Sequence, residues 1–345
     1  MTEEKEQKAR FGHPSRLLGL LILALSLAGG WFWLDYQQFL QTPLTIPEEG
    51  LAYTLEPGTT LRQLAEELAS REVIDNPWYL RALGRWEKSA QRIKAGEYIL
   101  PSGIRPRELL QRLVQGKVTQ YSLTLVEGWT FDQVMEAVRR DKVLKQTLEG
   151  LHATAIMERL GHPEKHPEGR FYPDTYRFPR GTTDLQFLAR AYRTMEEVLQ
   201  QEWAGREEGL PLKTPYEALI LASIVERETG RPEERPEIAG VFIRRLKKGM
   251  KLQTDPTVIY GMGDRFDGNI RRKDLREDTA YNTYIHTGLP PTPIAMPGRA
   301  AIHSVLHPAE GDALYFVAKG DGSHHFSARL EEHNRAVRKY QLKKR

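Results

Sequence analysis

Alternating apolar and polar residues predict three short strands early in the chain, at 51–55, 98–100 and 121–125. A glycine follows each strand, at Gly58, Gly103 and Gly128, and an amphipathic helical pattern follows each glycine. In the first of these helices the apolar residues recur at 61, 64, 65 and 68. Three such units in succession indicate repeated small α+β modules. Glycine turns also join strands to helices in unrelated folds, and this simpler interpretation stays open.

The most apolar helix of the second half has polar ends. Thr214 is its predicted N-cap, and Glu217, three residues on, is expected to complete a capping box. Residues 218–225 are uncharged and mostly apolar, which is typical of a helix that is buried on every side. A Gly-Arg-Pro sequence ends this helix shortly after Glu226 and Glu228.

Further periodic segments predict helices over 184–205 and 236–248 and a helical connection within 150–167. Residues 250–298 are rich in turn formers, have little periodicity and still carry many large apolar residues. We therefore predict a long ordered loop with a function. The chain ends in a predicted strand over 313–318, a turn, a strand over 324–327 and a helix from Leu330. The predicted fold class is α+β.

An uncharged segment, Leu17–Leu34, follows four basic residues near the N-terminus and ends in Trp31-Phe32-Trp33. Its length and its terminal aromatic residues favour a membrane-spanning helix. Because the basic flank of a membrane-spanning helix usually stays in the cytoplasm, we predict that residues 1–16 are cytoplasmic. Residues 17–35 would form the anchor and residues 36–50 a stalk. A cleaved signal peptide is the rival, because Ser26-Leu27-Ala28 is an acceptable cleavage site.

Length and composition limit the classes of function. A chain of 345 residues predicts two or three domains. The net charge of +4, without a basic cluster interleaved with aromatic residues, gives no indication of nucleic acid as a partner. The absence of cysteine excludes disulfides and thiolate chemistry. The sequence also lacks the motifs of serine esterases, nucleotide binding and dinucleotide binding.

The two glutamates at the end of the apolar helix are the leading candidates for catalysis. A carboxylate there faces the negative end of the helix dipole and lies partly out of water, and both effects raise its pKa. An acid that is still protonated near neutral pH suits general acid catalysis. Glu226 and Glu228 lie about 200° apart around a helix, so only one of them can face a given cleft. The alternative for either is a solvated residue that pairs with Arg227 or Arg231.

Residues 252–260 supply a further carboxylate, Asp255. As a turn residue before Pro256 it would cap backbone groups, whereas as a catalytic partner it would make a two-carboxylate glycosidase. Residues 281–284 and 288–294 combine tyrosine, asparagine, threonine and proline, a composition that suits the wall of a sugar-binding groove. Core packing explains the tyrosines equally well.

The histidines give little support for a metal. His303 and His307 are four residues apart, and His324 neighbours His325, but neither pair has a third ligand at metal spacing. We therefore predict no metal site and no cofactor.

Six segments resemble known families. Tyr53–Leu61 resembles the opening of LysM modules, which bind glycans that contain N-acetylglucosamine. Five motifs, in matching order and spacing, resemble the endolytic murein transglycosylases of the YceG-like family. They are Ala222–Thr229, Leu252–Gly263, Thr279–Tyr284, Gly288–Ile294 and Leu314–Val317. Five motifs in order are far more specific than any one of them.

The resemblance implies a LysM-like module over 51–119 and a catalytic domain over 120–345, in a single-pass protein of the inner membrane. It implies that nascent peptidoglycan strands are cut internally, between N-acetylmuramic acid and N-acetylglucosamine, to leave 1,6-anhydro ends. One acid suffices for this reaction, because the attacking hydroxyl belongs to the substrate. In the family this acid is the second glutamate of a Val-Glu-x-Glu stretch, which corresponds to Glu228.

The remaining site residues are expectations as well. Glu226 is expected to be a supporting or structural residue. The expected substrate contacts are Gln253, Thr254, Asp255, Tyr260, Tyr281, Asn282, Thr283 and His324. Family members often carry Gly-Gly-His-x-Phe in the last hairpin, and the serine in Gly322-Ser-His-His-Phe326 departs from that pattern at the residue before His324. The expected partners are peptidoglycan strands and the cytoplasmic membrane, with peptidoglycan synthases as candidates.

Two other functions remain open. The first is a hydrolase of the same glycan, with Asp255 as its second carboxylate. The second is a non-catalytic glycan-binding or scaffolding protein of the cell wall.

Overall fold

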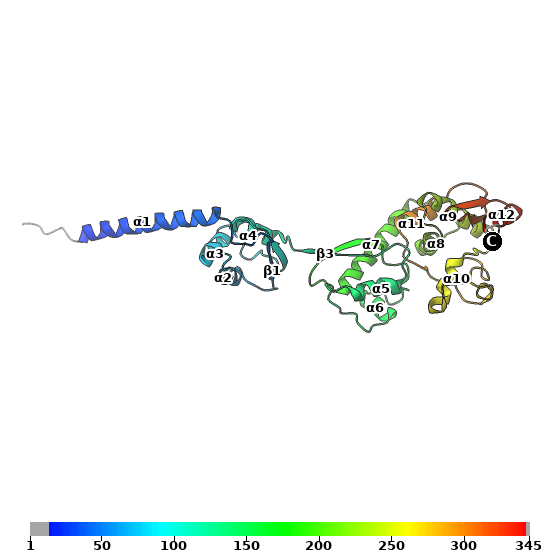
Figure 1. Ribbon diagram of the computed structural model, residues 1–345, viewed down its shortest axis with the longest axis horizontal. Helices are drawn as coiled ribbons and strands as arrows, with labels where there is room; N and C mark the ends of the chain where they lie inside the picture. The colour runs from blue at the N-terminus through cyan, green and yellow to red at the C-terminus, as the bar shows by residue number, and fades with distance from the viewer. Residues whose placement is uncertain (1–13, 343–345) are drawn as a thin grey trace, which may run out of the picture. The chain divides into compact units, whose positions relative to one another are not determined.

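The computed structural model of the chain describes residues 14–342, with side chains from Leu18 onward. Its contacts divide the chain into two compact units, with the boundary between Gln120 and Tyr121. Both units combine helices with two-stranded sheets, so the prediction of mixed helices and sheets is confirmed (Figure 1). The predicted cytoplasmic segment falls almost wholly outside the described residues.

The first unit begins with the long helix α1 (Pro14–Gln41). Residues Leu18–Gln41 are long and apolar enough to cross a membrane, and residues 18–34 are exposed, which is compatible with a single-pass anchor. The predicted stalk contains the last turn of α1 and also Leu44 and Ile46, which are buried in the core of this unit.

A two-stranded antiparallel sheet and three further helices complete the first unit. Strand β1 (Leu51–Leu55) pairs with β2 (Gly96–Leu100), and Tyr53 lies opposite Tyr98. The helices are α2 (Leu61–Ser70), α3 (Pro77–Trp86) and α4 (Pro106–Gln115). The turns before α2 and α4 contain Gly58 and Gly103, whose φ angles of 87° and 79° favour glycine. The first two predicted strand–glycine–helix units are therefore confirmed, and they share one core.

The third such unit belongs mainly to the second compact unit. Strand β3 (Gln120–Thr124) pairs with β4 (Thr175–Pro179) rather than with a strand of the first unit. Helices α5 (Phe131–Arg140), α6 (Ala153–Arg159) and α7 (Asp184–Ala204) supply the core around this sheet.

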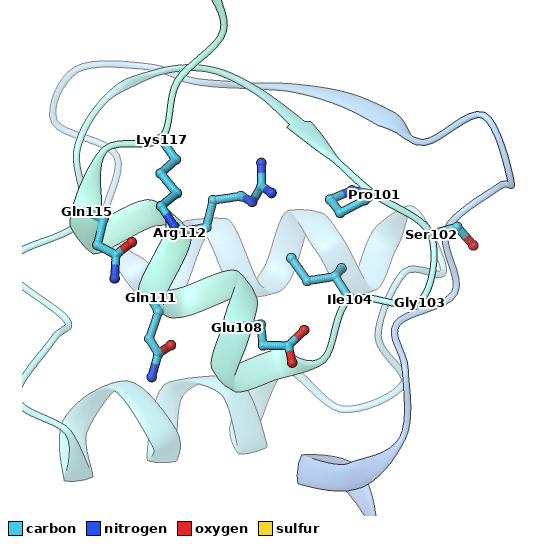
Figure 2. A pocket seen from close by; sticks show the side chains of 9 residues that line it. All are labelled: Pro101, Ser102, Gly103, Ile104, Glu108, Gln111, Arg112, Gln115 and Lys117. Atoms are coloured by element: carbon cyan, nitrogen blue, oxygen red, sulfur yellow. The ribbon is translucent and has the colours of Figure 1, made fainter.

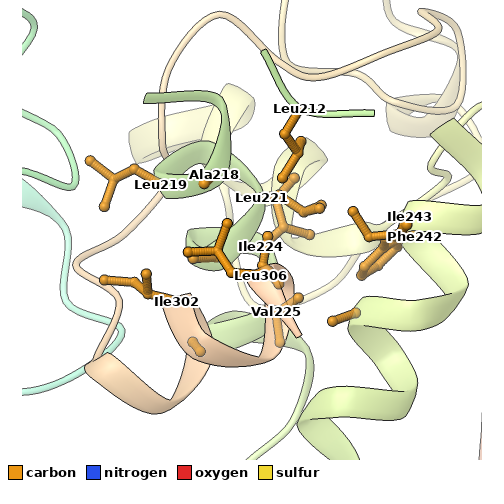
Figure 3. Packing of buried hydrophobic residues seen from close by; sticks show 14 of the residues in the cluster. Leu212, Ala218, Leu219, Leu221, Ile224, Val225, Phe242, Ile243, Ile302 and Leu306 are labelled. Carbon is orange, nitrogen blue, oxygen red and sulfur yellow. The ribbon is translucent and has the colours of Figure 1, made fainter. Parts of the chain in front are cut away.

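Helix α8 (Pro215–Glu228) is the centre of the second large core of this unit. Residues 218–225 are all buried, which confirms the predicted burial on every side. The helix packs against α7, α9 (Arg235–Lys247) and α11 (Arg299–Leu306). Figure 3 shows its side chains among those of α9 and α11. Each fully buried Leu or Ile of this kind contributes about 1.5–3 kcal/mol to folding. The end of α8 is therefore held rigidly.

The capping box at Thr214 is only half formed. The Thr214 hydroxyl accepts the backbone N–H of Glu217 at 3.2 Å, as predicted. The Glu217 carboxylate, however, accepts the N–H of Lys213 at 2.5 Å instead of that of Thr214. The Glu217 side chain therefore caps the backbone N–H of the residue before the N-cap, and not that of the N-cap itself as the motif predicts.

The turn-rich segment after α9 is not wholly irregular. It contains α10 (Asp255–Met262), so the prediction of a long loop is wrong at this point. Asp255 is the first residue of α10 rather than a turn residue, and the proline after it is favoured in the first turn of a helix. Short 3₁₀ turns occur in this segment at Gly263–Arg265 and Asp274–Arg276, and another, Pro232–Glu234, directly precedes α9.

The chain closes with the predicted hairpin and helix. Strand β5 (Tyr315–Ala318) pairs antiparallel with β6 (His324–Ser327), and α12 (Leu330–Val337) follows. A short π-helical segment, Arg338–Leu342, continues from α12.

Candidate functional site

Glu228, the last residue of α8, lines a cavity of about 510 Å³ in the second unit. The other walls come from the segment leading into α10, from the β5–β6 hairpin and from α12 with the segment after it, and Arg245 of α9 and Tyr284 also line the cavity. Segments about a hundred residues apart in the sequence therefore meet around one carboxyl group.

The surroundings of Glu228 favour its protonated form. The pKa of Glu228 is raised to about 7, mainly by burial and to a smaller extent by the nearby negative charge of Asp255. The Thr254 hydroxyl donates a hydrogen bond to Glu228 Oε1, which acts in the opposite direction. Within residues 14–342 no lysine, arginine or histidine forms an ion pair with Glu228. It is therefore an acid that keeps its proton near neutral pH and can give it up.

Glu226 has different surroundings. Its Oε1 lies 2.9 Å from Nη2 of Arg235, and its Oε2 accepts the backbone N–H of Gly298 at 2.9 Å. The Glu226 side chain is only 5% exposed. Burial raises its pKa, while the Gly298 N–H and Arg235 act against that rise. Glu226 joins the end of α8 to α9 and to the start of α11, and it is not part of the cavity lining.

Four of the eight expected substrate contacts line the same cavity as Glu228. They are Gln253, Thr254, Asp255 and His324. Gln253 has a φ angle of 52°, which only a firmly held non-glycine residue adopts. The buried Thr254 donates its backbone N–H to Thr283 Oγ1 at 3.1 Å. The Tyr284 hydroxyl donates to Asp255 Oδ1 at 2.6 Å and fixes that carboxylate.

His324 is held in place by Glu234. Its backbone N–H donates to Glu234 Oε1 at 2.9 Å, and its Nδ1 lies 2.7 Å from Glu234 Oε2. The carboxylate therefore orients the imidazole, and the serine departure at position 323 does not remove His324 from the cavity.

The other four expected contacts lie outside the cavity lining and support the surrounding loops. Thr283 bonds to Thr254 and Thr257, and Asn282 Nδ2 donates to the carbonyl of Glu277 at 2.8 Å. The rings of Tyr260 and Tyr281 meet edge to face with centroids 4.8 Å apart. For these tyrosines, the packing interpretation fits the geometry better than the groove interpretation.

A smaller polar pocket of about 310 Å³ lies in the first unit (Figure 2). It is formed by α4 and the turn after β2, and Gln111, Arg112, Gln115 and Lys117 line it. Arg112 also donates to the carbonyl of Ile99 at 3.2 Å. The one carboxylate in its lining, Glu108, serves the start of α4 by accepting the N–H of Arg105. This pocket has no candidate for acid catalysis.

The sequence matches the YceG-like family over residues 53–339. The chain belongs to the YceG-like family.

Named relatives agree with this membership. The chain is 32% identical over 300 residues to the endolytic murein transglycosylase of Bacillus subtilis strain 168, and the match covers 82% of each protein. It is 27% identical over 357 residues to the endolytic murein transglycosylase of Streptococcus pneumoniae strain D39. That match covers 92% of this chain and 63% of the streptococcal protein, so the chain spans less than two thirds of that relative. A crystal structure of a YceG-like protein from Listeria monocytogenes aligns with a TM-score of 0.53 and 29% identity, covering 84% of this chain and 99% of that one.

In this YceG-like chain, sequence reasoning missed Arg245, which supports the cavity from α9. Its guanidinium donates to the carbonyls of Leu252 at 2.9 Å and Leu314 at 2.6 Å and to Gln253 Oε1 at 3.3 Å. Arg245 therefore joins the segment before α10 to the segment before β5. The signal was available, because an arginine occurs at position 245 on the apolar face formed by residues 238, 241 and 242.

Glu168 was missed as well. It is 3% exposed, accepts the N–H of Phe131 at 3.0 Å and the hydroxyl of Tyr260 at 3.0 Å, and burial raises its pKa to about 7. It lies outside the 510 Å³ cavity, and its contacts hold the start of α5 and the side of α10. Glu168 thus shares a raised pKa with Glu228 but not its access to a ligand.

The histidines on α11 have carboxylate neighbours rather than a metal-ligand arrangement. His303 Nδ1 lies 2.8 Å from Glu202 Oε2, and the rings of His303 and His307 stack at 4.3 Å. Among residues 14–342, no group of three or more His, Cys, Asp and Glu side chains is placed to hold a metal ion.

Proposed function

We propose that this chain is an endolytic peptidoglycan lytic transglycosylase in which Glu228 serves first as general acid and then as general base. One observation carries the proposal: a mostly buried carboxyl group, which forms no ion pair with any described residue, lines a cavity of about 510 Å³. Burial raises the pKa of this group to about 7. The names of the two relatives, both endolytic murein transglycosylases, support the substrate class.

The proposed reaction uses one carboxyl group twice, first as an acid and then as a base. Glu228 donates its proton to the glycosidic oxygen between N-acetylmuramic acid and N-acetylglucosamine, and the C1–O bond breaks. The resulting Glu228 carboxylate takes the proton of the muramic 6-hydroxyl as its oxygen bonds to C1. A 1,6-anhydro ring forms, the acid is regenerated and no water is consumed. The intramolecular attack benefits from a high effective concentration of the hydroxyl.

We assign the neighbouring residues by their positions. Gln253, Thr254, Asp255 and His324 contact the glycan, since they share the cavity with Glu228. Tyr260, Tyr281, Asn282 and Thr283 act indirectly, by holding the loops that carry those contacts.

The rest of the chain has a proposed role too. The apolar helix α1 anchors the protein in the cytoplasmic membrane with its N-terminus inside, and the basic residues before it support this orientation. A LysM-like module over 51–119 binds glycan, and the catalytic domain over 120–345 lies outside the cytoplasm. Peptidoglycan synthases, which make the nascent strands, are candidate partners.

Product analysis tests the reaction. Purified protein incubated with uncrosslinked peptidoglycan strands should release fragments whose muramic ends are the 1,6-anhydro form, 18 mass units lighter than hydrolysed ends. Mass spectrometry separates the two because the hydrolysed product contains one more water. Reducing ends as the main product would favour the two-carboxylate hydrolase and contradict the proposal.

Asp255→Asn should change the pH dependence of the reaction. The protonated form of Glu228 is the active acid, so kcat/KM should be flat at low pH and fall about tenfold per pH unit above the pKa of about 7. Removing the Asp255 charge removes one cause that raises this pKa, so the falling limb should move to lower pH. Asp264→Asn, at an exposed site on a 3₁₀ turn, is the control and should leave the profile unchanged. If the falling limb of the kcat/KM profile stays at the same pH in Asp255→Asn, a group other than Glu228 controls the pH dependence.

A further inference from the structure

One side chain near the start of α3, Tyr79, packs on the end of α1 that follows its most apolar residues. The ring of Tyr79 contacts Phe32, Tyr36 and Phe39, with centroid distances of 5.4, 5.6 and 5.4 Å. The Tyr79 hydroxyl also donates to Asp35. These four residues of α1 recur at helical spacing, so they form one face over about two turns. The start of α3 is therefore fixed beside this face of α1.

This face coincides with the end of the proposed membrane span. The uncharged stretch Leu17–Leu34 is about 27 Å long as a helix, close to the thickness of the hydrocarbon layer. The first charged residue after it is Asp35, to which Tyr79 is bonded. If the anchor of the proposed function spans the membrane, the start of α3 must lie at the headgroup level.

The surface of α3 has the composition of a membrane interface. Trp78 is 67% exposed and Trp86 is 83% exposed, although tryptophan is normally well buried. Tryptophan is enriched at membrane interfaces, where one part of the ring is apolar and the other is wet. The guanidinium of Arg81 lies 4.7 Å from the centroid of the Trp78 ring. Trp78, Arg81 and Arg85 also line one largely apolar cavity of about 670 Å³.

The charge on this segment favours an anionic partner. Residues 77–94 contain five basic residues and one acidic residue, whereas residues 48–75 contain two basic and seven acidic residues. Within the described part of the chain, neither Arg81 nor Arg85 forms an ion pair, so both guanidinium groups are free to bind phosphate. Basic residues near an anionic leaflet each contribute about 1 kcal/mol to binding.

We propose that α3 is a second membrane contact, in which Trp78 and Trp86 enter the headgroup layer and Arg81 and Arg85 bind the phosphates of anionic phospholipids. The inference rests on the anchor of the proposed function. It goes beyond that function, because a contact through α3 would keep the first unit on the outer surface of the membrane, whereas α1 alone would only tether it there. A glycan stacked on Trp78 is the competing occupant, but it would not explain why α3 is fixed level with the end of the span.

The absence of cysteine makes a direct test possible, since a single introduced thiol carries one nitroxide label. The full chain is labelled at Ala82→Cys on α3, at Thr54→Cys on the exposed side of β1, or at Leu25→Cys in the span. Each protein is reconstituted into phosphatidylcholine vesicles with or without phosphatidylglycerol. Power saturation then measures collisions of the label with oxygen and with a water-soluble nickel chelate.

The label at position 82 should be protected from the chelate, most strongly with phosphatidylglycerol, while the label at position 54 stays accessible. Arg81→Gln and Arg85→Gln should each lower the ratio of docked to undocked α3 roughly fivefold. Trp78→Ala should lower it as well. Arg71→Gln is the matched control and should have no effect, because Arg71, which directly follows α2, already pairs with Glu67 at 2.6 Å.

Three outcomes would overturn the inference, and they are distinguishable. Equal accessibility at positions 82 and 54 with position 25 protected would refute the contact and leave the anchor intact. An accessible label at position 25 would refute the anchor and the contact together. Protection of position 82 by soluble peptidoglycan fragments, but not by the vesicles, would assign this surface to glycan.

Discussion

Replacing Glu228 with glutamine should lower the rate of glycan cleavage by about 10²–10⁴-fold, the usual contribution of general acid–base catalysis. Glutamine has nearly the same shape and can still accept the hydrogen bond from Thr254, but it has no proton to give to the leaving oxygen. The measurement is the rate of release of fragments with anhydro ends, with the variant and the unmodified protein at equal concentration.

The same variant should not be less stable. Folding raises the pKa of Glu228, so its stabilising contribution is present below the ordinary value of 4.5 and is lost as the pH rises through about 7. The uncharged glutamine avoids that loss, and at pH 8 the free energy of unfolding of Glu228→Gln should equal or exceed that of the unmodified protein. Urea titration at pH 5 and pH 8 checks this sign.

The control for Glu228→Gln is Glu197→Gln, an exposed change on α7 that should alter neither rate nor stability. Full cleavage by Glu228→Gln would end the assignment of the catalytic acid. Undetectable cleavage by the unmodified protein as well would favour the non-catalytic scaffold instead.

The local elements were predictable because they depend on neighbours in the sequence. The alternation in β1 and the continuous apolar run in α8 each produced the expected element. Helix α10 was missed because it is short and its residues include a glycine and β-branched side chains, which weaken the helical signal. The proline near its start was the useful clue.

The arrangement of the site depended on contacts that no local pattern contains. Periodicity puts Glu226 and Glu228 on opposite sides of α8 but does not say which side is the cavity. The two glutamates are distinguished by distant residues that bond to Glu226 and not to Glu228. These are Arg235 and the N–H of Gly298, which lie 9 and 72 residues from Glu226 in the sequence. Composition likewise could not separate core tyrosines from groove tyrosines, because both interpretations use the same side chain.

Replacing Glu226 with alanine should therefore destabilise the second unit by about 3–5 kcal/mol, the usual cost of removing one partner of a buried ion pair. The change leaves Arg235, whose side chain is 10% exposed, without its 2.9 Å partner, and leaves the N–H of Gly298 without its acceptor. Among the described carboxylates, Arg235 then retains a longer contact of 3.7 Å, to Glu127. Loss of structure in thermal and urea unfolding is the measurement.

Two variants make this result specific. Glu226→Gln keeps an acceptor for Gly298 and should lose less stability than Glu226→Ala. Glu226→Leu combined with Arg235→Met removes both charges and should recover much of the loss, because a buried pair can often be replaced by apolar residues. At temperatures where it is folded, Glu226→Ala should keep a cleavage rate within about tenfold of the unmodified protein, a smaller loss than removal of a catalytic acid. A stable Glu226→Ala protein that cleaves no glycan would reverse the roles of the two glutamates, since the group that donates the proton would then be the one clamped by arginine.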